Sequence, residues 1–387
     1  MAVPISYNIR NLKLRKGATV MTALGIALTV TIAIFIMALL AGLRDAFATS
    51  GEPQNVLVLR KGSTSELAAG GVEREAMQTI KDLAGIAKDS SGQPLVSGET
   101  ILVIVLPRKD GTGETNVTMR FLSPVGLELR PNIKITQGRW FSPGQREVVV
   151  SKSIHQRFSN TNIGDTMFFG KGYWTIVGVF DSGGSAHESE IWADINQIAS
   201  DLDRTQYSSV LMRATDPVTA LSLKNRVSDD QRLKLNGMLE SEYYAQQTST
   251  GGPIKVVGWF VAFIMAVGSC FAAMNTMYAA VAYRSREIAT LRIIGFSRPS
   301  ILTSFVLESL LLSLLGAVIG ILLMLPFNGM TTGTSNPVTF SEAVFRLRMT
   351  ANVITSAVIF ALIMGFLGGL APAWHAARRD MVVALRD

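Results

Sequence analysis

The sequence is poor in the residues that carry metal and redox chemistry. Its 387 residues include one cysteine, Cys270, and three histidines, His155, His187 and His375. A single cysteine excludes a disulfide within the chain, so its domains must be stabilised by packing alone. The stretch His187–Glu190 lacks the second histidine of the H-E-x-x-H zinc motif. We therefore expect no metal site, and a solvated loop at this stretch.

A nucleotide-binding loop is also missing. No G-x-x-x-x-G-K-[ST] pattern occurs, and the nearest stretch, Gly183–His187, lacks the lysine that would reach the phosphates. Ser185 and His187 do not form a catalytic triad, because the pattern around the serine is not that of a nucleophile elbow. We expect no catalytic residue and no bound cofactor in this chain.

Charge is absent from four long stretches. They lie between Lys16 and Arg44, between Lys255 and Arg284, between Glu308 and Glu342, and between Arg348 and Arg378. Each is longer than the ~20 apolar residues that a helix needs to cross a bilayer. The residues between the first stretch and the second are polar and punctuated by glycine. The sequence therefore predicts an α-helical membrane protein with four transmembrane helices and a large α+β extracytoplasmic domain between helices 1 and 2.

The basic residues indicate the orientation of the chain. Three short segments hold eleven basic residues against three acidic ones, Glu287, Asp380 and Asp387. The basic residues are Arg10, Lys13, Arg15, Lys16, Arg284, Arg286, Arg292, Arg298, Arg378, Arg379 and Arg386. Because short basic segments stay in the cytoplasm, both termini and the Arg284–Arg298 connection are expected inside. The net charge of +7 is thus a signal of topology, and we expect no binding of nucleic acid.

The N-terminus allows two interpretations. Ala46-Phe47-Ala48 resembles a signal-peptidase site, but the apolar stretch before it exceeds the ~7–15 residues of a signal peptide, so we expect it to be retained. Ile5, Ile9 and Leu12 have helical spacing beside the basic cluster. They predict an amphipathic helix on the inner leaflet, where acidic lipids would attract it.

Short β-branched runs in the large polar segment predict strands. These runs are Asn55–Arg60, Ile101–Leu106, Asn116–Phe121, Glu147–Ser151, Thr166–Phe169 and Trp174–Phe180. Helical spacing predicts helices near Val72–Leu83, Glu188–Leu202 and Asp216–Val227, the last with Asp216 as its N-cap. We expect loops at Gly62–Gly71 and Lys88–Glu99, and a helix over Ser228–Gln247 that leads into the second membrane helix.

These patterns divide the chain into nine segments. An amphipathic helix at 1–16 precedes transmembrane helix 1 at 17–44, and the extracytoplasmic domain occupies 45–252. Transmembrane helix 2 follows at 253–283, with a cytoplasmic helix at 284–299. Transmembrane helices 3 and 4 lie at 300–327 and 350–374, an extracytoplasmic loop at 328–349 joins them, and 375–387 forms a cytoplasmic tail.

The cytoplasmic segment Arg284–Arg298 carries an apolar stripe. Ile288, Leu291 and Ile294 fall on roughly one helical face, and Gly295 is placed to end the helix. A short amphipathic helix of this kind suits docking to a motor protein. Spacing alone favours a plainer interpretation, a basic interfacial turn that only sets the topology.

The same segment resembles the R-E-I-A-x-L-R-x-x-G-x-S-R signature of bacterial ABC permeases of the MacB/FtsX superfamily. Other stretches follow the family's pattern in the same order: Arg10–Thr29, Gly138–Phe141, Val148–Ser151, Ile163–Asp165, Thr175–Val179, Glu308–Gly316, Gly369–Ala373 and Ala376–Arg386. The resemblance covers nearly the whole chain. It departs at Asp380-Met381, where the family usually has Asp-Pro, and at Trp374-His375, which replaces a common basic pair.

The resemblance implies a mechanical function. In such permeases two copies, or two related chains, form a dimer on a cytoplasmic ABC ATPase that holds the ATP and Mg. Closure of the ATPase moves the short helix between spans two and three, and spans one and two pass the motion to the outer domain. On this basis the ATPase-coupling interface comprises Arg284, Arg286, Glu287, Ile288, Leu291, Arg292 and Gly295.

Polar and small residues in the membrane stretches are further candidates. Glu308 is an intramembrane carboxylate and by default a functional candidate, although an interfacial or packing role is the more ordinary interpretation. Gly316 and Gly320 form a small-xxx-small face for close helix packing. Similar faces occur at Gly365, Gly368 and Gly369 and at Ala262 and Ala266. Spacing does not decide whether these faces pack within the chain or between copies.

The sequence therefore predicts a permease of a bacterial inner-membrane ABC exporter, acting on a lipid-linked molecule, a lipoprotein, a peptide or a drug. Expected partners are the ATPase, a second permease copy or a related permease, membrane lipids, and possible periplasmic adaptor and outer-membrane channel proteins. The alternative is an FtsX-like regulator that activates a cell-wall hydrolase without transport. The size of the outer domain favours the exporter.

Overall fold

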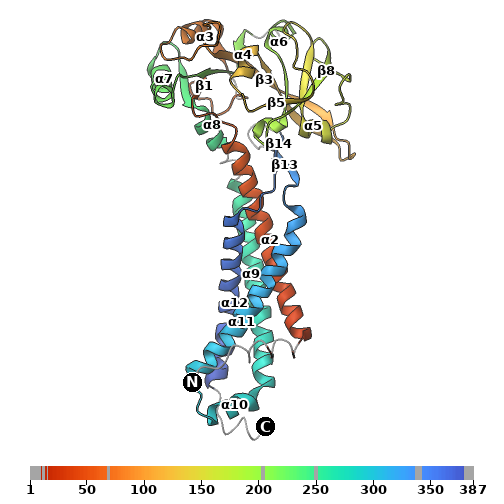
Figure 1. The fold of residues 1–387 in the computed structure, drawn as a ribbon, viewed down its shortest axis with the longest axis vertical. Coiled ribbons are helices and arrows are strands. Elements are labelled where there is room, and N and C mark those ends of the chain that lie inside the picture. Colours follow the sequence, from red (N-terminus) through yellow and green to blue (C-terminus); the bar gives the residue numbers. More distant parts are fainter. Residues whose placement is uncertain are drawn as a thin grey trace. The chain divides into compact units, whose positions relative to one another are not determined.

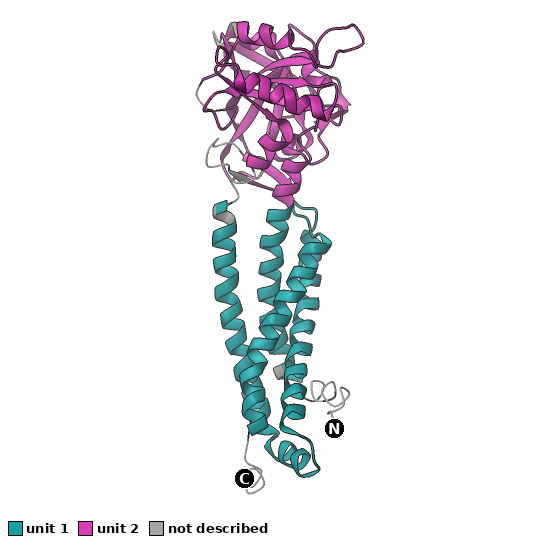
Figure 2. Cartoon of the chain, turned by 90° about the vertical axis from the view of Figure 1, so that its left-hand side faces the viewer, with its two compact units in different colours: residues 1–41, 252–330, 347–387 teal, residues 42–251, 331–346 magenta. Residues whose placement is uncertain are grey.

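The computed structural model of the chain describes residues 10, 14, 16–67, 70–201, 205–247, 252–335 and 342–378. The expected amphipathic helix with Ile5, Ile9 and Leu12 lies almost wholly outside these residues, as does the tail after Arg378. The chain divides into two compact units, which Figure 2 distinguishes by colour. Unit 1 comprises residues 1–41, 252–330 and 347–387, and unit 2 comprises residues 42–251 and 331–346.

Unit 1 is a helical bundle. Its long helices are α2 (Lys16–Ala48, whose last turns belong to unit 2), α9 (Gly252–Tyr283), α11 (Arg298–Met324) and α12 (Ala351–Arg378) (Figure 1). Of the described residues, these four helices are long and apolar enough to cross a membrane, with candidate spans of 28–30 residues. Each overlaps one of the four stretches that lack charge, although α11 begins before the third stretch, at Arg298, and contains Glu308. The predicted fold class is therefore confirmed: a four-helix membrane block with a large mixed α/β domain between helices 1 and 2.

Apolar and small residues hold the bundle together. Ile26, Val30 and Ile34 of α2 form one core with Ala317 of α11 and Ala357 of α12. The short helix α10 (Ser285–Ile293) connects α9 to α11, and a 3₁₀ turn, η3 (Leu325–Phe327), follows α11. Since α11 and α12 pack along each other, the C-terminal half of the bundle is a continuous helical pair.

Unit 2 is built on one sheet, which has ten strands in the described part of the chain. The strand order is β12-β1-β11-β3-β4-β9-β6-β8-β5, with β7 paired to β8. The strands are β1 (Asn55–Arg60), β3 (Val96–Pro107), β4 (Glu114–Leu122), β5 (Lys134–Gly138), β6 (Glu147–Ser151), β7 (Thr166–Phe169), β8 (Gly172–Asp181), β9 (Glu190–Asp194), β11 (Ser209–Arg213) and β12 (Leu235–Leu239). The pairs β4–β9 and β6–β8 are parallel, and the others are antiparallel.

Shorter elements complete unit 2. The helices are α3 (Arg74–Lys81), α4 (Pro124–Glu128), α5 (Lys152–Arg157), η1 (Ala186–Ser189), α6 (Ile195–Asp201), α7 (Pro217–Asp229) and α8 (Glu240–Gln247). Two small two-stranded sheets complete the unit. In one, β2 (Val72–Glu73) pairs with β10 (Gln206–Tyr207), and in the other, a hairpin, β13 (Thr331–Ser335) pairs with β14 (Glu342–Arg346).

Three clusters of buried apolar residues lie along this sheet, and the two largest occupy different halves of it. One gathers Val56 of β1, Ile80 of α3 and Leu223 of α7, and the other gathers Phe121 of β4 and Trp174 of β8. The twelve-residue strand β3 joins the two halves, because its first residues pair with β11 and its later residues pair with β4. Unit 2 is therefore two lobes that share one strand.

Several predicted elements are confirmed. Strands β1, β6 and β7 have the predicted bounds. Asp216 caps α7, because its side chain accepts hydrogen bonds from the N–H groups of Val218 and Thr219, and Pro217 occupies the first helical position.

Three other predictions for this region are wrong in part. The predicted helix Glu188–Leu202 begins instead as the fully buried strand β9, and only its second half is helical. The predicted helix Ser228–Gln247 is interrupted, because α7 ends at Asp229 and β12 precedes α8. The predicted loop Lys88–Glu99 already contains the start of β3.

The connection between α11 and α12 also differs from its prediction. The sequence predicts an extracytoplasmic loop over 328–349, whereas the structure shows the β13–β14 hairpin there. Residues 331–346 belong to unit 2 rather than to the helical bundle. Unit 2 is thus assembled from two separate parts of the chain.

Candidate functional site

Helix α10 is a short, well-terminated element. The Gly295 N–H donates to the Arg292 carbonyl at 3.2 Å and the Phe296 N–H to the Leu291 carbonyl at 3.1 Å. This is the Schellman pattern, which needs a left-handed residue after the helix. Gly295 supplies it with φ +108°. The sequence therefore placed the end of this helix correctly.

The apolar stripe of α10 does not form one exposed face. Ile288 is buried and Leu291 is half-buried, whereas Ile293 and Ile294 are 61% and 66% exposed. Arg286 and Glu287 are exposed as well. The outward surface of α10 thus combines a charged first turn with an apolar C-terminal end, and Ile293 is a residue that the sequence analysis did not single out.

Two of the predicted interface residues point into the bundle instead. The Arg284 guanidinium, between α9 and α10, contacts the Glu308 carboxylate on α11 at 2.9 Å, and both side chains are only 5% exposed. The guanidinium also lies 5.2 Å from the centre of the Phe305 ring. Arg292 donates to the backbone carbonyl of Ala377 on α12 at 3.0 Å. Helix α10 is thereby attached to both of the last two membrane helices.

The small-residue faces pack within the chain. A Cβ atom at Gly316 would lie 2.8 Å from the Ile26 Cβ, and one at Gly320 would lie 2.9 Å from the Ala27 carbonyl oxygen, both on α2. Ala262 and Ala266 of α9 are buried. Glycine at positions 316 and 320 therefore permits α2 and α11 to approach each other closely.

Unit 2 contains a buried ionic cluster that the sequence analysis missed. The Arg120 guanidinium on β4 contacts three carboxylates: Glu66 at 3.0 Å, Glu99 at 2.6 Å and Glu190 at 2.8 Å. Arg130 binds the second oxygen of Glu99 at 2.6 Å. An arginine near the end of the predicted strand Asn116–Phe121 was the one signal available, because a charge in a strand must be paired if it is buried.

The stretch His187–Glu190 belongs to this cluster, and the prediction of a solvated loop is wrong. His187 is 2% exposed, and its Nδ1 lies 3.0 Å from the Glu190 carboxylate. Burial opposes ionisation of Glu190, but Arg120 and His187 hold the pKa of that carboxyl well below its usual value. Burial raises the pKa of Glu240, because no cation among the described residues forms an ion pair with it.

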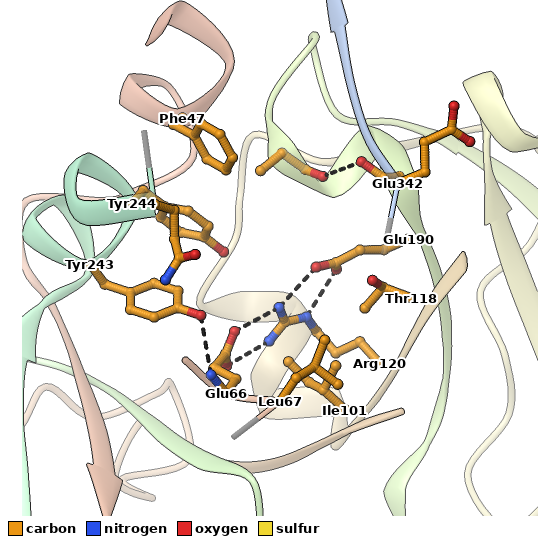
Figure 3. A pocket seen from close by; sticks show the side chains of 13 residues that line it. Phe47, Glu66, Leu67, Ile101, Thr118, Arg120, Glu190, Tyr243, Tyr244 and Glu342 are labelled. Atoms are coloured by element: carbon orange, nitrogen blue, oxygen red, sulfur yellow. Dashed lines mark hydrogen bonds and ion pairs between the residues drawn. The ribbon is translucent and has the colours of Figure 1, made fainter. Parts of the chain in front are cut away.

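A pocket of about 90 Å³ adjoins the cluster. Figure 3 shows Tyr243 and Tyr244 on one side and Arg120 and Glu190 across from them. Phe47 lies at its edge. Most of the lining comes from the sheet, from η1 and from the loop that carries Glu66. The rest comes from the end of α2, from α8, which precedes α9, and from β14, which precedes α12. Three connections to membrane helices therefore meet at one pocket within unit 2.

Charged side chains attach the β13–β14 hairpin to the rest of unit 2. The Glu342 carboxylate contacts Arg108 at 2.6 Å and also contacts Arg157 of α5. The Val344 N–H donates to the Ser189 hydroxyl at 3.0 Å. Glu342 is buried, so its two arginines offset the cost of removing a carboxylate from water.

Two family models match the chain. The model described as MacB-like periplasmic core domain matches residues 19–229. The model described as FtsX-like permease C-terminal matches residues 259–381. The chain therefore belongs to the family of MacB/FtsX-like permeases, and the resemblance seen in its motifs is confirmed.

Individual relatives are distant. The macrolide export ATP-binding/permease protein MacB of Mannheimia succiniciproducens is 24% identical over 387 residues, which cover 96% of this chain and 58% of that protein. YknZ of Bacillus subtilis, named an uncharacterized ABC transporter permease, is 24% identical over 393 residues, which cover 96% of this chain and 95% of YknZ. The chain thus spans little more than half of the first relative. A solved periplasmic region of MacB from Actinobacillus actinomycetemcomitans is 14% identical over 50% of this chain and 92% of that structure, with a TM-score of 0.38.

Proposed function

We propose that the chain is the non-catalytic permease subunit of an ABC exporter, which passes motion driven by a separate ATPase to its outer domain. The observation that carries this proposal is the construction of α10. Its exposed surface offers Arg286, Glu287, Ile293 and Ile294 to a partner. Its buried side is fixed to α11 and α12 by Arg284 and Arg292. A surface that binds on one side and is anchored on the other is suited to transmit force.

The orientation proposed from charge agrees with this role. The distribution of basic segments favours a cytoplasmic position for both termini and α10, and a position outside the inner membrane for unit 2. Cysteine substitutions at the exposed residues Ser91 and Asn225 should react with an impermeant reagent in spheroplasts, and one at exposed Ser297 should not. If only Ser297→Cys were labelled, the chain would have the opposite orientation and the proposal would be contradicted.

The chemistry of ATP is assigned to the partner. Since the sequence has no phosphate-binding loop, the ATP and Mg would be held by an ABC ATPase subunit. A second copy of this chain, or a related permease, would complete the complex. The substrate class proposed from the family resemblance is a lipid-linked molecule, a lipoprotein, a peptide or a drug.

Purification from the native membrane in mild detergent, with mass spectrometry of the proteins recovered, tests this proposal. An ABC ATPase together with a periplasmic adaptor would support export. The same ATPase with a cell-wall hydrolase would instead support the regulator. Recovery of no ATPase, under conditions that keep other transporters intact, would contradict both.

A further inference from the structure

We infer that motion from α10 reaches unit 2 by a second route, through α11, α12 and the β13–β14 hairpin, with Glu308 and Glu342 as its positioning residues. The insertion of the outer domain between the first two spans suggests only the route through those spans. This inference rests on the proposed function and adds a second mechanical connection to it. The two carboxylates lie at opposite ends of α11–hairpin–α12, one within each unit.

At the inner end, α10 cannot shift without disturbing α11. The Arg284–Glu308 pair is buried and bonded through both carboxylate oxygens, at 2.9 and 3.3 Å. Separation of this pair would leave two charges in an apolar bundle, which is far costlier than separation of an exposed pair. The Arg292 bond to Ala377 adds α12 to the same attachment.

Between the two ends, α11 and α12 are packed too closely to slide freely. A Cβ atom at Gly365 would collide with Ser313, and one at Gly369 would collide with Ser309. The absence of a side chain at these two glycines of α12 thus leaves room for the serine side chains of α11. Because interlocked surfaces have few alternative arrangements, the pair is expected to move as one body.

At the outer end, the hairpin that joins this helix pair is fixed to unit 2. Glu342 is held by Arg108 and Arg157, and Val344 by Ser189. Glu342 also lines the pocket where α8 and the end of α2 meet. A displacement of the helix pair relative to unit 2 must therefore either pass through these contacts or break them.

The test uses two fluorescent reporters in the complete complex with its ATPase, in a Cys270→Ser background. One reporter is attached at Thr331→Cys on the hairpin and the other at Gln145→Cys on the outer surface, both at exposed positions. The signal is the change in fluorescence of each reporter when ATP and vanadate are added. Glu308→Gln and Glu342→Gln are compared with the matched control Glu128→Gln, an exposed carboxylate, and the ratio of ATPase to permease is measured for each.

We expect Glu308→Gln to reduce both signals at least fivefold, and Glu342→Gln to reduce only the Gln145 signal, with the ATPase ratio unchanged throughout. The Arg284→Glu/Glu308→Arg exchange should restore part of the response. Unchanged signals in both carboxylate variants would overturn the second route and leave the proposed function standing. If neither reporter changed its fluorescence in the complex without carboxylate substitutions, or if no ATPase were recovered with that complex, the second route and the proposed function would both be overturned.

Discussion

The two units bury charge in different ways. In unit 1 one arginine, Arg284, meets one buried carboxylate, Glu308, beside an aromatic ring, and the exposed Glu287 lies 3.5 Å from the same guanidinium. In unit 2 Arg120 is surrounded by three carboxylates, and Arg130 and His187 bind two of these in turn. The first arrangement is a single joint between neighbouring helices. The second is a network that connects β3, β4, β9 and the loop that carries Glu66.

The difference indicates what each region must do. A network with several partners is hard to rearrange, because each buried charge that loses an ion pair must form another one or remain unpaired at a high cost in free energy. A single pair can shift as a unit with the two helices that carry it. The network therefore favours a rigid centre in unit 2, and the movement proposed above would be concentrated at the connections of unit 2 to the spans and at α10.

The largest loss of stability is expected when Arg120, the central residue of the ionic network in unit 2, is replaced. Arg120→Met would leave Glu66 and Glu190 without their arginine and should destabilise unit 2 by about 3–5 kcal/mol. Limited proteolysis and thermal unfolding of the full chain would measure this. Arg139→Met, which breaks the exposed pair with Glu147, should change stability by less than about 1 kcal/mol. Equal effects of the two variants would contradict the rigid network.

Acid should weaken the same network gradually. Arginine contacts lower the pKa of Glu99 and Glu190 below the usual 4.5, despite their burial. These groups therefore add stability that is complete above pH 4.5 and is lost as pH falls toward their folded-state pKa. Thermal unfolding across this range should show a falling midpoint, with a shallower fall in Glu190→Gln. A midpoint independent of pH below 4.5 would contradict the assignment.

A smaller effect is expected in the bundle. Gly320→Val would force Cβ against the Ala27 carbonyl and Val30 and should cost about 1–3 kcal/mol through overpacking. Gly268→Val on α9 is the matched control, because no atom lies within 4 Å of a Cβ there. Thermal unfolding in detergent would compare them. Equal midpoints for the two variants would mean that α2 and α11 do not pack in this way.

The smallest effect concerns a helix cap in unit 2. Asp216→Ala removes the acceptor for the Val218 and Thr219 N–H groups and should cost about 1 kcal/mol. Its control is Asp216→Asn, which keeps an acceptor and should lose much less stability. Denaturant unfolding of the full chain would resolve the difference, and equal losses would show that charge rather than capping matters at this position.

Local patterns predicted much of the fold. The absence of charge located four helices, and β-branched runs located β1, β6 and β7 with their bounds. Strand β9 was not predicted, because all five of its residues are buried and it therefore lacks the alternation of apolar and polar residues that distinguishes a half-exposed strand. Strand β12 was not predicted either, because it lies within a polar stretch that is rich in helix-forming residues.

The candidate site was less predictable, because its contacts are distant in sequence. Glu308 was visible as a charge within a membrane stretch, but its partner Arg284 lies 24 positions earlier and was predicted to belong to the ATPase-coupling interface. Arg120 meets Glu190 across 70 positions. No spacing rule reports such pairs, since tertiary packing alone brings them together.

The most direct test of the account is the amount of ABC ATPase that remains bound when the exposed end of α10 is altered. Ile293→Asp/Ile294→Asp changes only outward side chains, whereas Ile288→Val in the buried face serves as a control. The account predicts that the double variant inserts normally and loses most of the bound ATPase, and that the control retains it. A double variant that keeps the full amount of ATPase would contradict the assignment of α10 as the coupling helix.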